Sequence, residues 1–218
     1  MAITLALLQF DIAFGKPEEN YAHVKALIER AVQSRPDIIV LPELWTTGYD
    51  LTRLDTIADD HGDTTKRLLA NIAKKYQVNI VAGSVAKRNS KGQVFNTTMV
   101  FNRDGLVIGE YDKVHLFRLM DEEKYLEPGN KKGLFTLEGV PAAGVICYDI
   151  RFPEWIRSHT STGAEWLFVP AEWPTPRIEH WRTLLQSRAI ENQAYVIACN
   201  RVGSDPNNAF GVHSMVID

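Results

Sequence analysis

Residues 3–43 read ITLALLQFDIAFGKPEENYAHVKALIERAVQSRPDIIVLPE. Residues 3–9 are rich in Leu and Ile and too short for a free-standing helix, so they predict a buried strand. After Pro17, apolar side chains recur at helical spacing behind two glutamates, which indicates an amphipathic helix. Residues 37–41 (DIIVL) predict a second buried strand that ends just before Glu43. This order of elements implies a crossover connection.

The same alternation continues through the rest of the chain. Helices are predicted at residues 65–76, 153–159 and 178–191, and strands at residues 78–85, 95–101, 106–111, 142–146, 166–169, 195–199 and 213–217. Residues 102–105 have the composition of a hairpin turn. Residues 112–133 are polar, without period and longer than most connections, which predicts an active-site loop. The whole pattern predicts a layered α/β domain with helices on both sides of its strands.

Composition sets the broad class. The chain has 218 residues, of which 45% are hydrophobic and 23% charged, and its formal net charge is −3. These values predict a single globular domain over residues 1–218, without nucleic-acid partners. Its apolar runs are too short to cross a membrane. Two cysteines, and an apolar start with no basic residue before Lys16, favour a cytoplasmic protein.

Several common motifs are missing from the sequence. It has no phosphate-binding G-x-x-x-x-G-K-[ST], no G-x-G-x-x-G after a strand and no G-x-S-x-G. Residues 59–63 (DDHGD) offer oxygen and nitrogen ligands, but consecutive side chains seldom all point to one metal. This run precedes a predicted helix, where acidic residues favour the start. We interpret it as a solvated helix start.

Reactive side chains follow four of the predicted strands. They are Glu43, Cys147, Glu172 and Asn200, and ligands collect at the carboxyl ends of strands in open α/β sheets. A carboxylate, a thiol, a second carboxylate and an amide form a plausible reactive cluster. Each alone also has a structural interpretation, as a turn cap, a small buried thiol or a loop amide. His115 and His213 are candidates for a papain-like partner of Cys147, although nothing in their spacing selects either.

Three segments together resemble the carbon-nitrogen hydrolase, or nitrilase, superfamily. They are residues 41–49 (LPELWTTGY), 111–117 (YDKVHLF) and 144–154 (GVICYDIRFPE). The words LWTTGYD, HLFR, AEWP and NRVG are most similar to the omega-amidase branch. The resemblance covers residues 3–218 and implies a four-layer αββα sandwich. It also implies a homodimer or larger homo-oligomer, with candidate interface helices after Arg151 and around Trp181.

The resemblance also implies a set of catalytic residues. Glu43, Lys113 and Cys147 match the family's triad, and Glu122 matches its additional glutamate, although the adjacent Glu123 is an alternative. An ordinary thiol has a pKa of about 8.5, so a base or a cation must activate it. Glu43 suits the proton transfer, and Lys113 suits both the thiolate and the oxyanion of a tetrahedral intermediate.

Further side chains are expected around the substrate. The N–H of Tyr148 is predicted to be a second oxyanion donor, and the other expected substrate-binding residues are Tyr49, Glu172, Trp173 and Arg177. The implied reaction is hydrolysis of a small carboxylate-bearing amide such as 2-oxoglutaramate through a Cys thioester, without metal or organic cofactor. A remote carboxylate needs a paired cation, for which Arg118, Arg177 and Arg201 are candidates.

Two other functions remain open from sequence. A nitrilase or an N-carbamoyl amidohydrolase uses the same triad, and a catalytically silent binding module belongs to a different class. Family members also continue for several dozen residues beyond the segment that matches residues 213–218. Whether this chain is a fragment lacking a C-terminal segment stays open from sequence.

Overall fold

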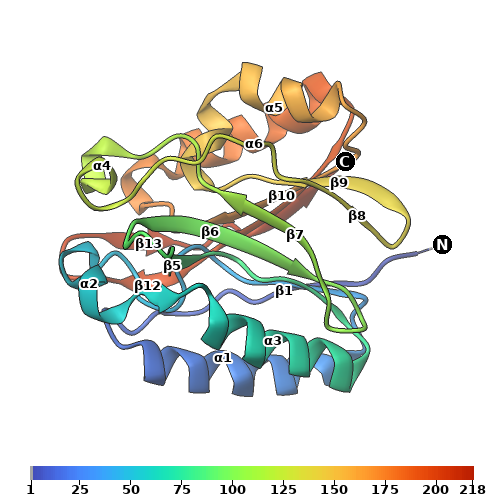
Figure 1. Cartoon of the computed structure of the whole chain (residues 1–218). Helices are drawn as coiled ribbons and strands as arrows, with labels where there is room; N and C mark the ends of the chain where they lie inside the picture. The colour runs from blue at the N-terminus through green and yellow to red at the C-terminus, as the bar shows by residue number, and fades with distance from the viewer. Residues whose placement is uncertain (1) are drawn as a thin grey trace.

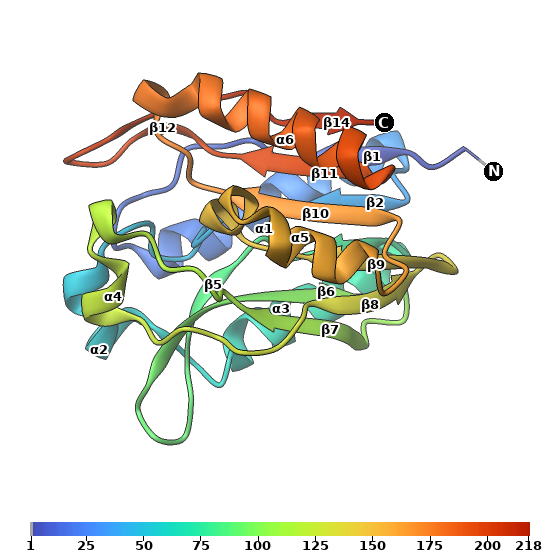
Figure 2. The ribbon, with the colours of Figure 1, turned by 90° about the horizontal axis from the view of Figure 1, so that it is seen from above.

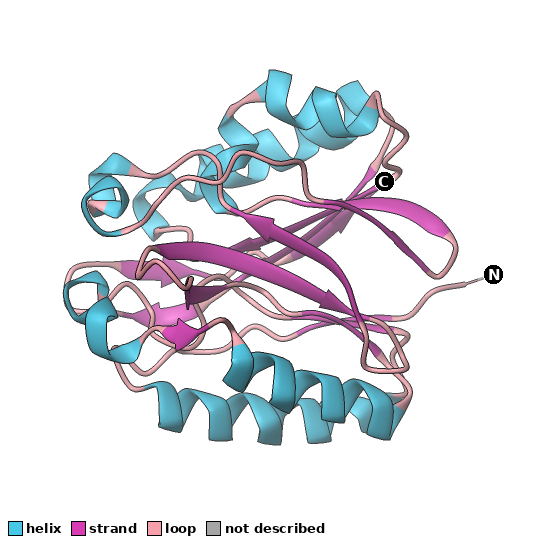
Figure 3. Ribbon diagram, in the orientation of Figure 1, coloured by secondary structure: helices cyan, strands magenta, loops and turns pink. Residues whose placement is uncertain are grey.

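The structure is a computed structural model that describes residues 2–218. Within these residues, two β-sheets pack face to face and helices cover the outer face of each sheet (Figures 1 and 3). The four layers follow the order helix, sheet, sheet, helix. The predicted αββα sandwich is therefore confirmed.

The first sheet has seven strands and contains the crossover predicted from residues 3–43. Pairing is parallel from β1 to β2 and from β2 to β4, whereas β6 runs antiparallel to β4, β5 and β7. Helices α1 (Pro17–Ala31) and α3 (Asp63–Tyr76) cover its outer face (Figure 1). The strands are β1 (Leu5–Leu7), β2 (Ile38–Val40), β3 (Asp59–Asp60), β4 (Asn79–Val81), β5 (Val85–Arg88), β6 (Val94–Phe101) and β7 (Val107–Asp112).

The second sheet has five strands in the order β14, β11, β10, β9, β8. Helices α5 (Pro153–Thr160) and α6 (Ile178–Asn192) lie over it, as the view from above shows (Figure 2). The strands are β8 (Leu134–Leu137), β9 (Val140–Gly144), β10 (Trp166–Ala171), β11 (Tyr195–Asn200) and β14 (Met215–Ile217). The pairs β9–β10 and β10–β11 are parallel, so their carboxyl ends reach one edge.

Alternating side chains along the strands divide the core into layers. Ile38 and Val40 of β2 point between the two sheets, where they belong to one cluster with Phe168 of β10. Ile39 points the other way and joins the cluster under α1 and α3. Because successive side chains of a strand face opposite sides, a strand covered on both faces needs an uninterrupted apolar run.

Residues 78–85 form two strands instead of the one predicted. Between β4 and β5, Gly83 has a φ of +59°, a conformation that favours glycine. A side chain at Gly83 would collide with the main chain of Leu41 and Pro42. The glycine therefore lets this turn pass close to the segment that carries Glu43.

Several short elements of the structure were not predicted from the sequence. Residues 112–133, predicted to lack regular structure, contain a 3₁₀ turn at Arg118–Met120 and the helix α4 (Glu122–Tyr125). Strand β8 and the hairpin β12 (Val202–Ser204) to β13 (Ala209–Gly211) were not predicted either. Together with α2 (Leu54–Ile57), α4 and this hairpin gather at one end of the sandwich (Figures 1 and 2).

The acidic run at residues 59–63 begins a helix, as predicted, but its first carboxylate is not solvated. Asp59 is buried, and its carboxylate accepts hydrogen bonds from the N–H groups of Thr64 and Thr65 in the first turn of α3. These bonds satisfy donors that an α-helix leaves free at its start. Across residues 2–218, the helices are too short or too polar to span a bilayer.

Candidate active site

Strands of both sheets bring the predicted reactive residues to one edge of the sandwich. Glu43 follows β2 and Lys113 follows β7 in the first sheet, whereas Cys147 follows β9 and Glu172 follows β10 in the second. All four side chains are buried. Asn200, the last residue of β11, supports this edge by accepting the N–H of Trp173 at 2.7 Å.

A lysine between two carboxylates forms the centre of the cluster. Lys113 Nζ lies 2.8 Å from Glu43 Oε1 and 2.7 Å from Glu122 Oε1, and none of the three side chains is exposed. The hydroxyl of Tyr49 lies 2.8 Å from Glu122 Oε1 and 3.2 Å from Glu43 Oε1. Asn96 donates a further hydrogen bond to Glu43 at 2.8 Å. These contacts fix the Lys113 ammonium and leave one of its three protons available to a ligand.

The structure distinguishes between the two adjacent glutamates. Glu122, the first residue of α4, is buried, and its second oxygen accepts the N–H of Phe117 at 2.6 Å. Glu123 is exposed. Glu122 is therefore the glutamate that contacts Lys113.

Cys147 occupies a backbone conformation that is uncommon for a residue with a side chain. Its φ is +45°, at the start of the 3₁₀ turn Cys147–Arg151. Such conformations cost about 1–3 kcal/mol and cluster at functional sites, where the surrounding structure maintains them. The Glu43 carboxylate and the Lys113 ammonium are close enough to the thiol to shift its pKa.

Asp149 supports the turn that carries Cys147. One of its oxygens accepts the N–H of Ile146 at 2.9 Å and the hydroxyl of Tyr111 at 2.7 Å. The other contacts the N–H and Nδ1 of His115 at 3.0 and 2.7 Å. One buried carboxylate therefore connects the strand end before Cys147 to the loop that follows Lys113.

This network was not found from sequence and excludes one alternative. The ring of His115 contacts Asp149 and stacks on Phe152 at a centroid distance of 3.7 Å. His213 contributes its carbonyl to Trp181. In residues 2–218, neither histidine forms a hydrogen bond with Cys147, so a papain-like pair is not supported. The available sequence signal was Asp149 in residues 147–151 (CYDIR), but a single Asp in a turn often has only a local structural role.

The electrostatics favour a resting thiol. Lys113 is predicted to favour the thiolate, and it does lower the pKa of Cys147. However, burial and the Glu43 carboxylate raise that pKa more, and it lies well above the usual range. Burial lowers the pKa of Lys113, but Glu122 and Glu43 raise it more strongly, so this side chain remains an ammonium. Activation of the thiol therefore requires proton transfer to a base.

A narrow pocket leads to Cys147. Its lining contains the predicted substrate residues Tyr148, Glu172, Trp173 and Arg177, together with Phe117, Arg151 and Pro174. Tyr49, by contrast, is buried in the cluster around Lys113, where its hydroxyl contacts Glu43 and Glu122. Tyr148 lies in the first turn of the 3₁₀ helix, where N–H groups lack intrahelical partners.

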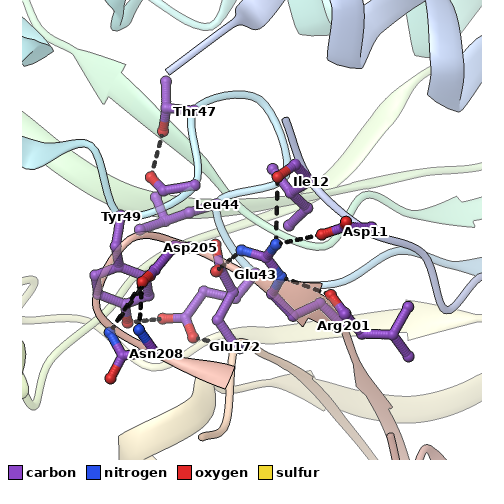
Figure 4. Close-up of polar contacts among 12 residues, drawn as sticks. Asp11, Ile12, Glu43, Leu44, Thr47, Tyr49, Glu172, Arg201, Asp205 and Asn208 are labelled. Atoms are coloured by element: carbon purple, nitrogen blue, oxygen red, sulfur yellow. Dashed lines mark hydrogen bonds and ion pairs between the residues drawn. The ribbon is translucent and has the colours of Figure 1, made fainter. Parts of the chain in front are cut away.

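The arginines differ from the prediction. Arg201, predicted in a rim loop, is completely buried: it donates to Glu172 at 2.6 Å and to Asp11 at 2.7 Å (Figure 4). It is therefore already paired and does not serve a substrate carboxylate. Arg118 is exposed, whereas Arg177 lines the pocket.

Arg151 also lines the pocket, and sequence reasoning missed its role as a cation. Its guanidinium lies over the rings of Tyr148 and Trp173, at 5.7 and 5.2 Å from their centroids. Its Nε is buried and has no hydrogen-bond partner among residues 2–218. Arg151 follows Cys147 by four residues in the motif CYDIR, which was the available signal. Two guanidinium groups thus face the same pocket as the thiol.

The described residues contain no group of three or more His, Cys, Asp or Glu side chains arranged to hold a metal ion. The Lys113 ammonium occupies the position between Glu43 and Glu122. The reactive groups brought together at this edge are a thiol, an ammonium and carboxylates.

Comparisons with known proteins find similar sequences and structures. The carbon-nitrogen hydrolase family model matches residues 4–218. A 2-oxoglutaramate amidase of Bacillus subtilis is 53% identical over the whole chain, which covers 83% of that protein. The omega-amidase YafV of Escherichia coli is 38% identical over 94% of the chain and 77% of its own length. The crystal structure of Nit3 of Saccharomyces cerevisiae, described as a member of branch 10 of the nitrilase superfamily, superposes with a TM-score of 0.91 at 29% identity, covering 99% of this chain and 82% of Nit3.

Proposed function

This chain belongs to the carbon-nitrogen hydrolase family, and from that membership we propose that it is an amidase that releases ammonia from 2-oxoglutaramate or a similar carboxylate-bearing amide. The observation that carries the proposal is the buried cluster of Glu43, Lys113 and Glu122 beside the thiol of Cys147. The name of the relative from Bacillus subtilis supports the choice of substrate.

The proposed reaction begins with attack of Cys147 on the amide carbon. Glu43 takes the thiol proton as Sγ bonds to the carbonyl carbon, and the carbonyl oxygen becomes an oxyanion. The free N–H of the Lys113 ammonium and the main-chain N–H of Tyr148 stabilise this charge. Glu122 holds Lys113 in place and keeps it charged. A base is needed at this step because burial raises the pKa of the thiol.

Glu43 then returns the proton to the amide nitrogen. The carbon–nitrogen bond breaks, ammonia leaves, and a thioester joins the acyl group to Cys147. A water molecule enters the position left by ammonia and loses a proton to Glu43 as it attacks the thioester. The second tetrahedral intermediate expels the Cys147 thiolate, which recovers its proton from Glu43.

The pocket supplies cations for a carboxylate remote from the amide. Arg177 and Arg151 both line it, and the buried Arg151 Nε lacks a partner in the described part of the chain. A buried carboxylate is stable only when paired or well hydrogen-bonded, and guanidinium groups suit that purpose. The proposed substrate carries such a carboxylate, whereas a simple aliphatic amide does not.

Assembly into a homodimer or larger homo-oligomer is proposed as well. Helices α5 and α6 form one outer layer of the sandwich (Figure 2). Ile190, near the end of α6, is 73% exposed. Trp181, by contrast, is completely buried and donates to a carbonyl within the chain, so it is not available to a partner. If this layer forms an interface, Ile190→Glu should shift the chain to a smaller species in light scattering.

The decisive experiment is to measure ammonia release from a panel containing 2-oxoglutaramate, butyramide, butyronitrile and an N-carbamoyl amino acid. We expect 2-oxoglutaramate to give by far the highest kcat/KM. A preference for the nitrile or the carbamoyl compound would replace the proposal with those activities. Absence of turnover on every substrate would favour a silent binding module.

A further inference from the structure

One carboxylate oxygen of the site has no partner. Glu43 accepts hydrogen bonds at both oxygens, from side chains at Oε1 and from the N–H of Glu172 at Oε2, 2.8 Å away. Glu122 accepts Lys113 at one oxygen and Phe117 at the other. Glu172 Oε2 contacts Arg201, but Glu172 Oε1 is buried and unpaired. Among residues 2–218, no other buried carboxylate oxygen lacks a hydrogen bond.

The position of this oxygen is fixed by a network of its own. Arg201 lies between Glu172 and Asp11 and stacks on the ring of Phe210 at 4.3 Å (Figure 4). Its guanidinium also donates to the carbonyls of Ile12 and Val202. These contacts fix Arg201, which holds Glu172 at Oε2. They leave Oε1 in place without competing for it.

Glu172 connects this network to the reacting groups. Glu172 lines the same pocket as Cys147, and its main-chain N–H donates to Oε2 of the proposed base, Glu43. A buried oxygen without a partner costs free energy unless a ligand satisfies it. A ligand that supplies a hydrogen-bond donor would satisfy it.

Resting on the proposed function, we propose that Glu172 Oε1 accepts a hydrogen bond from the NH₂ group of the substrate amide and thereby selects amides over esters. A primary amide nitrogen carries two N–H donors. The oxygen that replaces it in an ester carries none, and its lone pairs face the carboxylate. A site built to accept an N–H discriminates against analogues that lack the donor.

Glu172→Gln tests this role without changing the size of the side chain. The Arg201 guanidinium can only donate, so the glutamine turns its carbonyl towards Arg201 and its NH₂ into the pocket. The variant therefore presents a donor where the wild type presents an acceptor. Burial raises the pKa of Glu172 to about 8, although Arg201 opposes this rise, so the assay is run at a pH above that value.

The measurement is kcat/KM for 2-oxoglutaramate and for the methyl ester of 2-oxoglutarate at the same carboxyl group. We expect the amide-to-ester ratio to fall by about 10–100-fold in Glu172→Gln, as for loss of one hydrogen bond to a charged group. Both substrates form the same thioester, so the ratio reports only on steps up to departure of the leaving group. An unchanged ratio, or no ester turnover by the variant, would overturn the inference.

Asp11→Asn is the matched control. Asp11 contacts the same Arg201 but from outside, its side chain is 62% exposed, and it does not line the pocket. We expect the wild-type ratio in this variant. An equal fall there would assign the effect to the ion network and reject a contact with substrate.

The experiment distinguishes failure of the proposed function from failure of this inference alone. If the wild type releases no ammonia from 2-oxoglutaramate, the proposed function fails, whereas an active enzyme whose ratio ignores Glu172→Gln refutes only the present inference. If Glu172→Gln does not fold, the Cys147→Ala variant is titrated with the amide and the ester by calorimetry. At least about tenfold tighter binding of the amide is expected, and equal binding would contradict the proposal.

Discussion

Lys113 Nζ lies 2.7 Å from Glu122 Oε1, and both side chains are completely buried. A buried ion pair is weak evidence for stability, but removing one partner leaves an uncompensated charge that costs about 3–5 kcal/mol. The proposed catalytic cation is therefore also a structural element. Its loss is expected to affect folding as well as turnover.

Lys113→Ala is expected to abolish measurable kcat and to lower the free energy of unfolding by about 3–5 kcal/mol at neutral pH. Burial and Glu43 already raise the pKa of Glu122, and loss of the ammonium raises it further. A carboxyl whose pKa is higher in the folded state binds more protons there, so the variant loses stability as pH rises from the unfolded pKa to the folded one. Urea unfolding at several pH values measures this. Wild-type stability at neutral pH would contradict it.

Glu43→Gln is expected to lower kcat by about 10²–10⁴-fold and the free energy of unfolding by about 1–3 kcal/mol, because the NH₂ of glutamine faces the N–H of Glu172 in place of Glu43 Oε2. Glutamine keeps an oxygen that can accept from Lys113 and Asn96, but it cannot take the Cys147 proton. Steady-state kinetics and thermal unfolding are measured on the same preparation. A rise in KM at unchanged kcat would show that Glu43 binds substrate without acting as a base.

The two cysteines are expected to differ in reactivity. Cys147 lines the pocket beside Glu43, whereas Cys199 lies between the sheets, and burial raises its pKa to about 12. Brief treatment with iodoacetamide should modify Cys147 and abolish turnover in proportion. Peptide mass spectrometry identifies the labelled residue, and Cys199→Ala should inactivate at the wild-type rate. Preferential labelling of Cys199 would overturn the assignment.

Much of the fold follows from local sequence, because strands covered on both faces need continuous apolar runs. Residues 37–41 and 195–199 show this clearly, and the side chains that follow them reach the predicted edge. The short elements were missed for the opposite reason. β8 has one buried residue of four, and the exposed ones carry no regular pattern.

The site residues could be predicted from sequence where the residue type has few other roles at that position. Cys147, Lys113 and Glu43 stand beside strands within recognisable words. The choice between Glu122 and Glu123 depended on which one the short helix α4 turns inward, and periodicity does not determine this over four residues. Arg201 could not be distinguished from a rim arginine, because its partners Glu172 and Asp11 are 29 and 190 residues away in the sequence.

Asp149→Asn tests the turn that positions Cys147. Asparagine has one acceptor oxygen where Asp149 has two. Its NH₂ group must therefore face either the hydroxyl of Tyr111 or the N–H of His115, both of which donate. We expect kcat to fall by about 10–100-fold, with slower alkylation of Cys147 and a nearly unchanged KM, because displacement of the nucleophile by about 1 Å has effects of this size. Tyr111→Phe removes only one of the four contacts and should lose much less activity. Equal alkylation rates in wild type and Asp149→Asn would reject the positioning role.

Arg177→Gln tests recognition of the remote carboxylate. Arg177 lines the pocket that contains Cys147, and its guanidinium lies over the ring of Phe117 at 5.8 Å. Loss of a hydrogen bond between charged groups should raise the KM for 2-oxoglutaramate by about 10–100-fold while leaving that for butyramide unchanged. Arg118→Gln is the control, since that arginine is exposed and does not line the pocket. If both variants raise KM equally, the effect is one of net charge, and if Arg177→Gln leaves KM unchanged, the carboxylate binds elsewhere in the pocket, with Arg151 as the remaining cation.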